Sequence, residues 1–160
     1  MSARPVEIGR SAAATHRAAA GRAPHEEGMN WSAVMGVTLG ERRDLLPPPA
    51  FDSPPASLAE RARRALYEVP DPEFPISVLD LGLVYGIHAE EATGRVTVRL
   101  SFTATACPCM DFIRWDVRER LLREPGVETV GIEVVWDPPW TTERISDRGR
   151  RALARAGVSL

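Results

Sequence analysis

The sequence predicts an α/β two-layer sandwich whose elements follow the order helix, strand, strand, helix, strand, helix. Two observations predict it. Apolar residues recur at helical spacing in two segments, and they alternate along three other short segments. Helices with one apolar stripe and strands with one apolar face bury both surfaces by packing in layers. We therefore expect a small mixed sheet of three to four strands with helices packed on one face.

A capping box opens the first helix. Ser57 and Glu60 have the S-x-x-E spacing that closes a first helical turn. Pro70 and Pro72 end the helix, because proline lacks an N–H and restricts the residue before it. The expected buried face consists of Leu58, Ala62, Ala65, Leu66 and Val69.

Two strands and a polar turn follow the helix. The turn spans residues 90–94, and so short a connection favours an antiparallel hairpin. The second strand alternates its apolar residues strictly with polar ones. The first strand is expected to place Leu81, Leu83, Tyr85 and Ile87 on one face. The apolar residues of the second are Val96, Val98, Leu100 and Phe102.

A second helix is expected to begin after Cys107-Pro108 and to run to about Arg123, where residues 125–126, Pro-Gly, stop it. Its stripe is Met110, Ile113, Val117 and Leu121, widened by Phe112 and Leu122.

A third strand and a last helix complete the pattern. A polar, Arg-rich helix from about Thr142 to Ala156 closes the chain. If the second and third strands are parallel, the crossover between them should be right-handed. The apolar residues of the third strand are Val130, Ile132, Val134 and Trp136.

The folded domain is therefore expected over residues 57–156. Residues 1–56 are predicted to be a low-complexity, mostly disordered tail that ends in a proline-rich linker, because most of this stretch offers no large apolar residue to bury. The apolar island at residues 31–39 is a candidate docking segment.

Composition excludes several classes of function. The net charge of −2 gives no electrostatic reason to expect nucleic acid or an anionic membrane as partner. No apolar run approaches the roughly 20 residues of a membrane span. All 20 basic residues are arginines, which leaves no lysine for a Schiff base or a P-loop. Cys107 and Cys109 are too close in sequence for an unstrained disulfide, so we expect thiols in a reducing cytoplasm.

The sharpest local feature is residues 103–111, Thr-Ala-Thr-Ala-Cys-Pro-Cys-Met-Asp, where a strand ends and a helix begins. Pro108 suits the first helical position, which places Cys107 at or next to the N-cap. Unpaired backbone N–H groups and the helix dipole would there lower the thiol pKa. A thiolate binds soft metals or attacks electrophiles. The alternative is that Cys107 is a small buried residue filling a strand–helix corner.

Other candidate residues lie nearby in the sequence. Cys109 is a possible second thiol ligand, although a residue one turn into a helix can simply pack. Asp71 and Glu73 put two carboxylates on a proline-stiffened loop, which is either part of a site or an ordinary turn. Thr103 and Thr105 could orient a bound anion or sulfur ligand, but threonine is common at strand ends.

Two further features are more consistent with a structural role than with a catalytic one. His88 ends a strand beside an acidic turn and is expected to be solvated, so nothing places a base beside Cys107 for hydrolase-type catalysis. Residues 136–140, Trp-Asp-Pro-Pro-Trp, form either a packed corner or a binding platform.

Two motifs together resemble the PaaD/SufT-like family of metal–sulfur cluster assembly domains. Residues 71–85, Asp-Pro-Glu-Phe-Pro-Ile-Ser-Val-Leu-Asp-Leu-Gly-Leu-Val-Tyr, resemble the family's D-P-E…L-G-x-V segment. Residues 103–108, Thr-Ala-Thr-Ala-Cys-Pro, resemble its T-x-x-x-C-P segment. The resemblance extends over residues 57–155 and implies the family's α/β fold, in agreement with the element order.

The resemblance implies a cytoplasmic, bacterial accessory factor for iron–sulfur cluster assembly or delivery, without enzymatic turnover of its own. It assigns the key cysteine to Cys107, the acidic residue to Asp71 and the threonines to Thr103 and Thr105. The implied cargo is iron or an iron–sulfur cluster, held transiently, and the implied partners are client apo-proteins and cluster scaffold proteins. Cys109 departs from the common pattern, and the cysteine-rich zinc segment of PaaD itself is absent.

Ligand counting adds a constraint to this hypothesis. A cluster usually needs four protein ligands, mostly thiolates, and the chain has two cysteines. A homodimer, a partner protein or a small thiol would have to complete the set. Two other hypotheses stay open: an adaptor that recruits clients through Trp31, Trp136 and Trp140 without touching metal, and a thiol redox or transferase enzyme.

Overall fold

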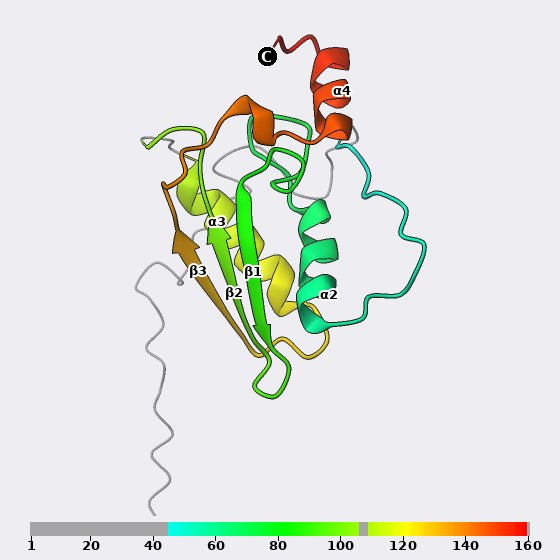
Figure 1. Cartoon of the computed structure of the whole chain (residues 1–160), viewed down its shortest axis with the longest axis vertical. Coiled ribbons are helices and arrows are strands. Elements are labelled where there is room, and N and C mark those ends of the chain that lie inside the picture. Colours follow the sequence, from blue (N-terminus) through cyan, green and yellow to red (C-terminus); the bar gives the residue numbers. More distant parts are fainter. Residues whose placement is uncertain (1–44, 106–108, 160) are drawn as a thin grey trace, which may run out of the picture. The chain divides into compact units, whose positions relative to one another are not determined.

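A computed structural model describes residues 45–105 and 109–159. The order of elements agrees with the predicted one (Figure 1). The helices are α2 (Leu58–Ala65), α3 (Met110–Leu122) and α4 (Asp147–Arg155), and the strands are β1 (Val84–Glu90), β2 (Arg95–Leu100) and β3 (Thr129–Val134). Two short 3-10 helices, η1 (Leu66–Glu68) and η2 (Thr142–Arg144), extend α2 and precede α4. Among the described residues, no helix is long and apolar enough to cross a membrane.

The sheet has the order β1-β2-β3, with β2 in the centre. β1 and β2 form the predicted antiparallel hairpin, whereas β2 and β3 run parallel, so the sheet is mixed. The pairing of β1 with β2 is interrupted by a bulge between Val84 and Gly86, which leaves Tyr85 without an opposite residue. The carboxyl ends of β2 and β3 therefore leave the sheet at the same edge.

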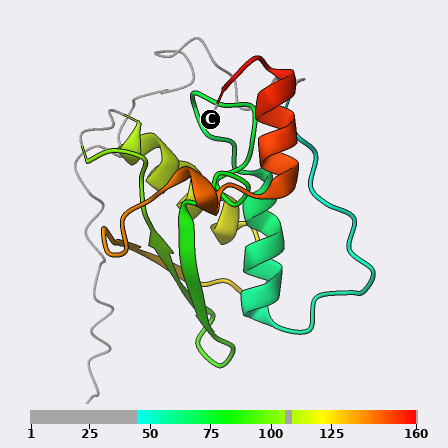
Figure 2. The same cartoon turned by 45° about the horizontal axis from the view of Figure 1, so that its top comes forward.

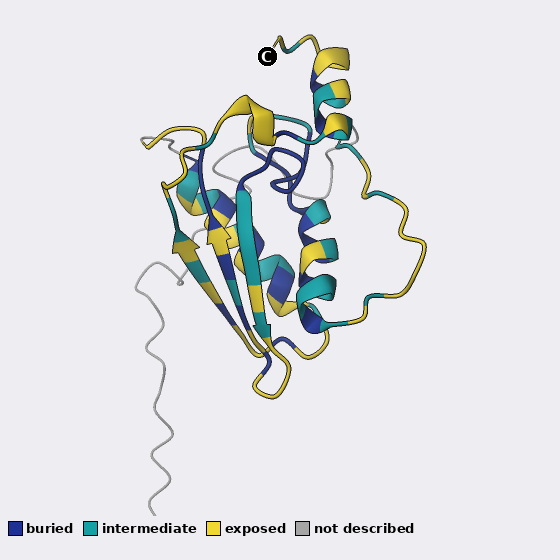
Figure 3. Cartoon of the chain, in the orientation of Figure 1, coloured by how far each residue is buried: buried dark blue, intermediate teal, exposed yellow. Residues whose placement is uncertain are grey.

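Helices α2 and α3 cover one face of the sheet and contact each other (Figures 1 and 2). The core between the two layers is apolar, with the buried segments of the strands and helices facing each other in Figure 3. In β2, Val96, Val98 and Leu100 are fully buried, and the alternating Arg95 and Arg99 are exposed. The predicted period of two along this strand is confirmed.

The start of α2 is confirmed in atomic detail. The Ser57 hydroxyl oxygen accepts a hydrogen bond from the Glu60 N–H at 3.1 Å, as an N-cap side chain does. The Glu60 carboxylate accepts a bond from the Ala56 N–H at 2.8 Å and pairs with Arg64. These contacts, the backbone bond first, lower the pKa of Glu60 below its ordinary value of 4.5. All five residues of the predicted apolar face of this helix are buried.

Helix α4 packs on the loop that precedes β1. The Ser146 hydroxyl caps α4 by accepting a bond from the Gly149 N–H at 3.0 Å. The same hydroxyl donates a bond of 2.6 Å to the carboxylate of Asp80 in this loop. Leu153 then completes the contact by joining the apolar core.

Several details of the predicted elements are wrong. The first strand begins at Val84, because Leu81 and Leu83 are buried in a tight turn where Gly82 has φ +77. The last helix is split, since Ile145 has an extended backbone and separates η2 from α4. Leu122 does not widen the apolar stripe of α3, because it lies on the solvent side and is 38% exposed.

The second predicted helix begins close to the expected position, after residues 107–108. Helix α3 starts at Met110, and Cys109, not Cys107, is its N-cap residue. Cys107 and Pro108, expected at or next to the N-cap and at the first helical position, lie outside the described residues.

Residues 45–56 contain no helix or strand, but they touch the domain. The Leu46 N–H donates a bond of 3.0 Å to the Pro75 carbonyl oxygen. The ring of Phe51 lies 6.0 Å from that of Tyr67 and is covered by the Arg64 guanidinium at 4.2 Å. Most of the predicted tail, with the island at residues 31–39, lies outside the described residues.

Candidate functional site

The predicted site lies at the sheet edge where β2 and β3 end. The Val135 N–H donates a bond of 2.8 Å to the Leu100 carbonyl oxygen, so the two strands stay paired up to this edge. Just beyond it, the Phe102 and Trp136 rings meet with centroids 6.0 Å apart. The segment that carries the cysteines starts from this contact and leads to the N-terminus of α3.

The described residues of this segment lead from the core into solvent, and the segment ends at a buried residue. Phe102 is 3% exposed, whereas Thr103 and Thr105 are exposed. Cys109 is buried, with 8% of its surface accessible, and its carbonyl oxygen accepts the Ile113 N–H at 3.0 Å. Cys109 is thus the N-cap residue of α3 and not a residue one turn into the helix. Cys107 itself lies outside the described residues.

Asp71 is buried and organises its own loop. One oxygen, Oδ1, accepts hydrogen bonds from the N–H groups of Glu73 at 2.9 Å and Phe74 at 3.0 Å. The Asp71 N–H donates to the Ile76 carbonyl oxygen at 2.9 Å, which closes the loop. This geometry gives Asp71 a structural role as an Asx turn. Glu73, in contrast, is exposed to solvent.

Asp80 is a second buried carboxylate, which the sequence analysis did not single out. It is 1% exposed. It accepts bonds from the hydroxyls of Ser77 at 2.9 Å and Ser146 at 2.6 Å, and it pairs with Arg148 at 3.1 Å. The sequence does contain a signal for its burial, because Asp80 stands between two leucines in the stretch Leu79-Asp80-Leu81-Gly82. Both leucines are buried in the structure.

His88 is not brought to this edge. It pairs with Thr97 in the middle of the hairpin, and its side chain is exposed. Four residues separate it from Val84 at the edge, a distance of about 13 Å along a strand. Within residues 45–105 and 109–159, no group of three or more His, Cys, Asp and Glu side chains could hold a metal ion.

The two tryptophans of residues 136–140 have different environments. Trp140 is part of the packing, because its indole N–H donates a bond of 2.9 Å to the Leu81 carbonyl oxygen. Trp136 is 41% exposed, with one side against Phe102. Trp136 is therefore the more exposed of the two and the better placed to contact another molecule.

Comparisons with known proteins point to one family. A family model described as "Iron-sulfur cluster assembly protein" matches residues 59–134. An Fe-S protein maturation auxiliary factor of Porphyromonas gingivalis is 42% identical over 90 residues, which cover 56% of this chain and 85% of the relative. The factor SufT of Staphylococcus aureus, another Fe-S protein maturation auxiliary factor, is 35% identical over 89 residues, which cover 56% of this chain and 97% of the relative.

The chain belongs to the PaaD/SufT-like family of iron–sulfur cluster assembly proteins. A solved domain of unknown function from Bacillus anthracis is 33% identical to this PaaD/SufT-like chain and superposes with a TM-score of 0.58. The match covers 61% of this chain and 92% of that domain. It supports the α/β fold with its three-stranded mixed sheet.

The matched range of the PaaD/SufT-like model contains every residue that the sequence analysis assigned to the site. It runs from α2 to the end of β3 and stops at Val134. The Trp136 segment, η2 and α4 lie beyond it. The cysteine segment is thus part of the matched range.

Proposed function

We propose that this chain is a cytoplasmic accessory factor in iron–sulfur cluster assembly or delivery, and that Cys107 binds iron or a cluster transiently through its thiolate. The observation that carries the proposal is the family match over residues 59–134, which spans the cysteine segment. Similar proteins are named Fe-S protein maturation auxiliary factors, and a further relative from Deinococcus radiodurans is named an iron–sulfur cluster carrier protein.

The position of the cysteine segment supports this role. The segment begins at the buried Phe102 and ends at the buried Cys109, while Thr103 and Thr105 between them are exposed to solvent. A ligand carried by such a segment can be passed on, because a partner protein reaches an exposed loop without unfolding the core. Iron and iron–sulfur clusters bind thiolates in preference to hydroxyl or amide groups.

The two cysteines have different parts in the proposal. Cys109 is buried at the start of α3, which favours packing over metal binding. Cys107 is therefore the principal ligand and Cys109 an auxiliary one. Since four ligands are usual, the remaining ones come from a second copy of the chain, a scaffold or client protein, or a small thiol.

Anaerobic reconstitution of the full chain with Fe²⁺ and sulfide tests the proposal. We expect visible cluster absorption and bound iron in the wild type, and at least a tenfold loss of bound iron in Cys107→Ser, because a hydroxyl is a poor ligand for iron in a cluster. Cys109→Ser should retain most of the iron. Circular dichroism checks that each variant stays folded.

Two results would sink the proposal. One is a wild-type chain that takes up neither iron nor cluster under these conditions. The other is a Cys107→Ser variant that binds iron and supports client maturation as well as the wild type.

The variant Asp71→Asn separates the charge of this residue from its structural role. The amide oxygen of asparagine can still accept the Glu73 and Phe74 N–H bonds. A loss of bound iron without a loss of stability would therefore assign the carboxylate charge to the site.

A client-recruiting adaptor that binds no metal is the second candidate, and the exposure of Trp136 beside Phe102 favours it. In this case Cys107→Ala would support client maturation normally, while Trp136→Ala would abolish the capture of the client. Trp115, which is 40% exposed on α3, provides the matched control for loss of an exposed indole.

A further inference from the structure

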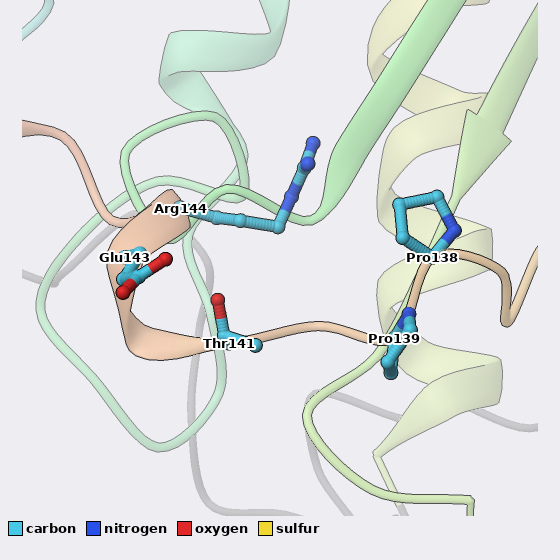
Figure 4. A pocket seen from close by; sticks show the side chains of 5 residues that line it. All are labelled: Pro138, Pro139, Thr141, Glu143 and Arg144. Atoms are coloured by element: carbon cyan, nitrogen blue, oxygen red, sulfur yellow. The ribbon is translucent and has the colours of Figure 1, made fainter.

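A pocket of about 600 Å³ lies in the segment that follows β3. Its lining is formed by Pro138, Pro139, Thr141, Glu143 and Arg144 (Figure 4). All five of these residues are exposed, so the pocket is an open depression of the surface, although its volume is in the range of small-molecule sites. All five residues lie beyond Val134, where the match to the family model ends.

Arg144 is held in one orientation at this pocket. Its Nε–H donates a bond of 3.2 Å to the Gly82 carbonyl oxygen, and its guanidinium carbon lies 3.7 Å from the centroid of the Tyr85 ring. Figure 4 shows the side chain extending from η2 in the direction of Pro138. A guanidinium fixed by a backbone bond and an aromatic ring loses little further freedom when it binds an anion.

The charges at the pocket are not neutralised by the protein. In the part of the chain that the structure describes, neither Arg144 nor Glu143 forms a salt bridge, although both line the pocket. The two residues are neighbours in η2 and carry opposite charges. A dianion would be attracted by Arg144 but repelled by Glu143, whereas a ligand with one charge of each sign matches both.

We propose that this pocket binds a zwitterionic α-amino acid with an apolar side chain. Arg144 receives the carboxylate through its Nη groups, since a guanidinium matches a carboxylate with two parallel hydrogen bonds. Glu143 receives the ammonium group. Pro138 and Pro139 supply the apolar wall for the side chain, and the Thr141 hydroxyl is a further hydrogen-bonding group at the rim.

The proposal does not depend on the cysteine chemistry. The residues proposed to contact the ligand all follow β3, whereas the iron-binding test above substitutes only residues before α3. The two segments meet at one sheet edge, where Phe102 contacts Trp136. Because the two tests substitute different residues, failure of one proposal leaves the other intact.

Titration of the full chain with L-leucine, followed by NMR shifts of the backbone amides of Gly82 and Thr141, tests the site. We expect saturable shifts with a Kd on the order of 1 mM, because a small ligand in an open pocket makes few contacts. Two fragments of leucine serve as probes of each charge. 4-Methylpentanoate lacks the ammonium group and 3-methylbutylamine lacks the carboxylate, and each should bind at least about tenfold more weakly.

Variants assign the contacts. Glu143→Gln and Arg144→Gln should each weaken leucine binding by about tenfold or more. The affinity of Arg144→Lys should be intermediate, because lysine keeps the positive charge but lacks the pair of parallel N–H donors of a guanidinium. Arg151→Gln removes an equal charge from an exposed residue of α4 and should leave the Kd unchanged. Glu143 makes no hydrogen bond or ion pair within the described residues, so its substitution reports on binding without disturbing the fold.

The proposal is overturned if leucine gives no saturable shift, or if the two single-charge fragments bind as well as leucine. It is also overturned if Glu143→Gln and Arg151→Gln have the same effect on the Kd. Saturable binding that needs both charged groups of the ligand and both charged residues of the pocket establishes the site.

Discussion

Asp80 shows at the level of one residue how this fold accommodates a buried charge. The carboxylate is 1% exposed, yet it has two hydroxyl donors, Ser77 and Ser146, and one cation, Arg148. The contacts with Ser146 and Arg148 form only if the loop before β1 and the start of α4 are both in place. A buried charge without such partners would cost several kcal/mol.

Replacement of Asp80 by alanine is expected to lower the free energy of unfolding by about 3 kcal/mol, because it leaves two hydroxyls without their acceptor and a guanidinium without its ion-pair partner. Urea denaturation of the two proteins measures the difference. Asp111→Asn is the control, since the Asp111 side chain is 91% exposed in its pair with Arg114 and such pairs contribute little. Equal stabilities of Asp80→Ala and Asp111→Asn would show that the buried network is not a stabilising feature.

At the level of elements, the helices begin in two different ways. Helices α2 and α4 have a serine N-cap whose hydroxyl oxygen accepts a backbone N–H, from Glu60 and Gly149 respectively. Helix α3 begins at the buried Cys109, and no side-chain cap bond of this kind is formed there. The difference explains why a capping box marks the start of α2 in the sequence, whereas the start of α3 has no such signal.

The Ser57 cap should contribute about 1 kcal/mol to stability. Ser57→Ala removes the acceptor of the Glu60 N–H, and we expect the midpoint of urea denaturation to fall accordingly with an unchanged slope. Ser53→Ala, a few residues earlier in an exposed stretch, should have almost no effect. If both substitutions shift the midpoint equally, the hydroxyl of Ser57 is not acting as a cap.

At the level of the whole domain, contacts between distant segments determine how the sheet is closed at the edge where β1 begins and where β2 and β3 end. The turn at residues 79–83 meets η2 and α4, which are more than 60 residues later in the chain. Arg144 and Trp140 both bond to backbone carbonyls of this turn, at Gly82 and Leu81. The candidate pocket exists because these contacts hold η2 against the start of β1.

Gly82 is the position where this closure is most sensitive. Its φ is +77, and a Cβ placed there would lie 2.4 Å from the backbone oxygen of Arg144, so Gly82→Ala combines backbone strain with a clash that no side chain can relieve. We expect a loss of about 3 kcal/mol or more in the free energy of unfolding. The NMR shifts of the residues around the pocket should change as well.

Gly157 provides a matched control for this prediction. Its φ is +81, but a Cβ there would meet nothing within 4 Å. Gly157→Ala should therefore cost only the backbone term, about 1 kcal/mol. Comparable losses for the two variants would mean that the contact between Gly82 and η2 contributes nothing to stability.

The sequence by itself determined the elements and the family. Periodic apolar residues are a local signal, so α2, the hairpin, α3 and β3 were predicted with errors confined mainly to their ends. The two motifs at residues 71–85 and 103–108 were sufficient to indicate the PaaD/SufT-like family, because both are continuous in sequence. The roles of Cys107 and Asp71 in cluster binding stay predictions, and the structure adds that Asp71 organises its own turn.

Only the tertiary structure decided which distant residues meet. Asp80 and Ser146, or Gly82 and Arg144, are more than 60 residues apart, and neither pair leaves any periodic or compositional signal in the sequence. The start of the first strand also depended on tertiary contacts. Leu81 and Leu83 fit a strand pattern, but they belong to the turn that contacts Trp140 and Arg144 and not to β1. Local patterns fix which face of an element is apolar, whereas the position of a turn or a pocket depends on packing between segments that only the folded chain brings together.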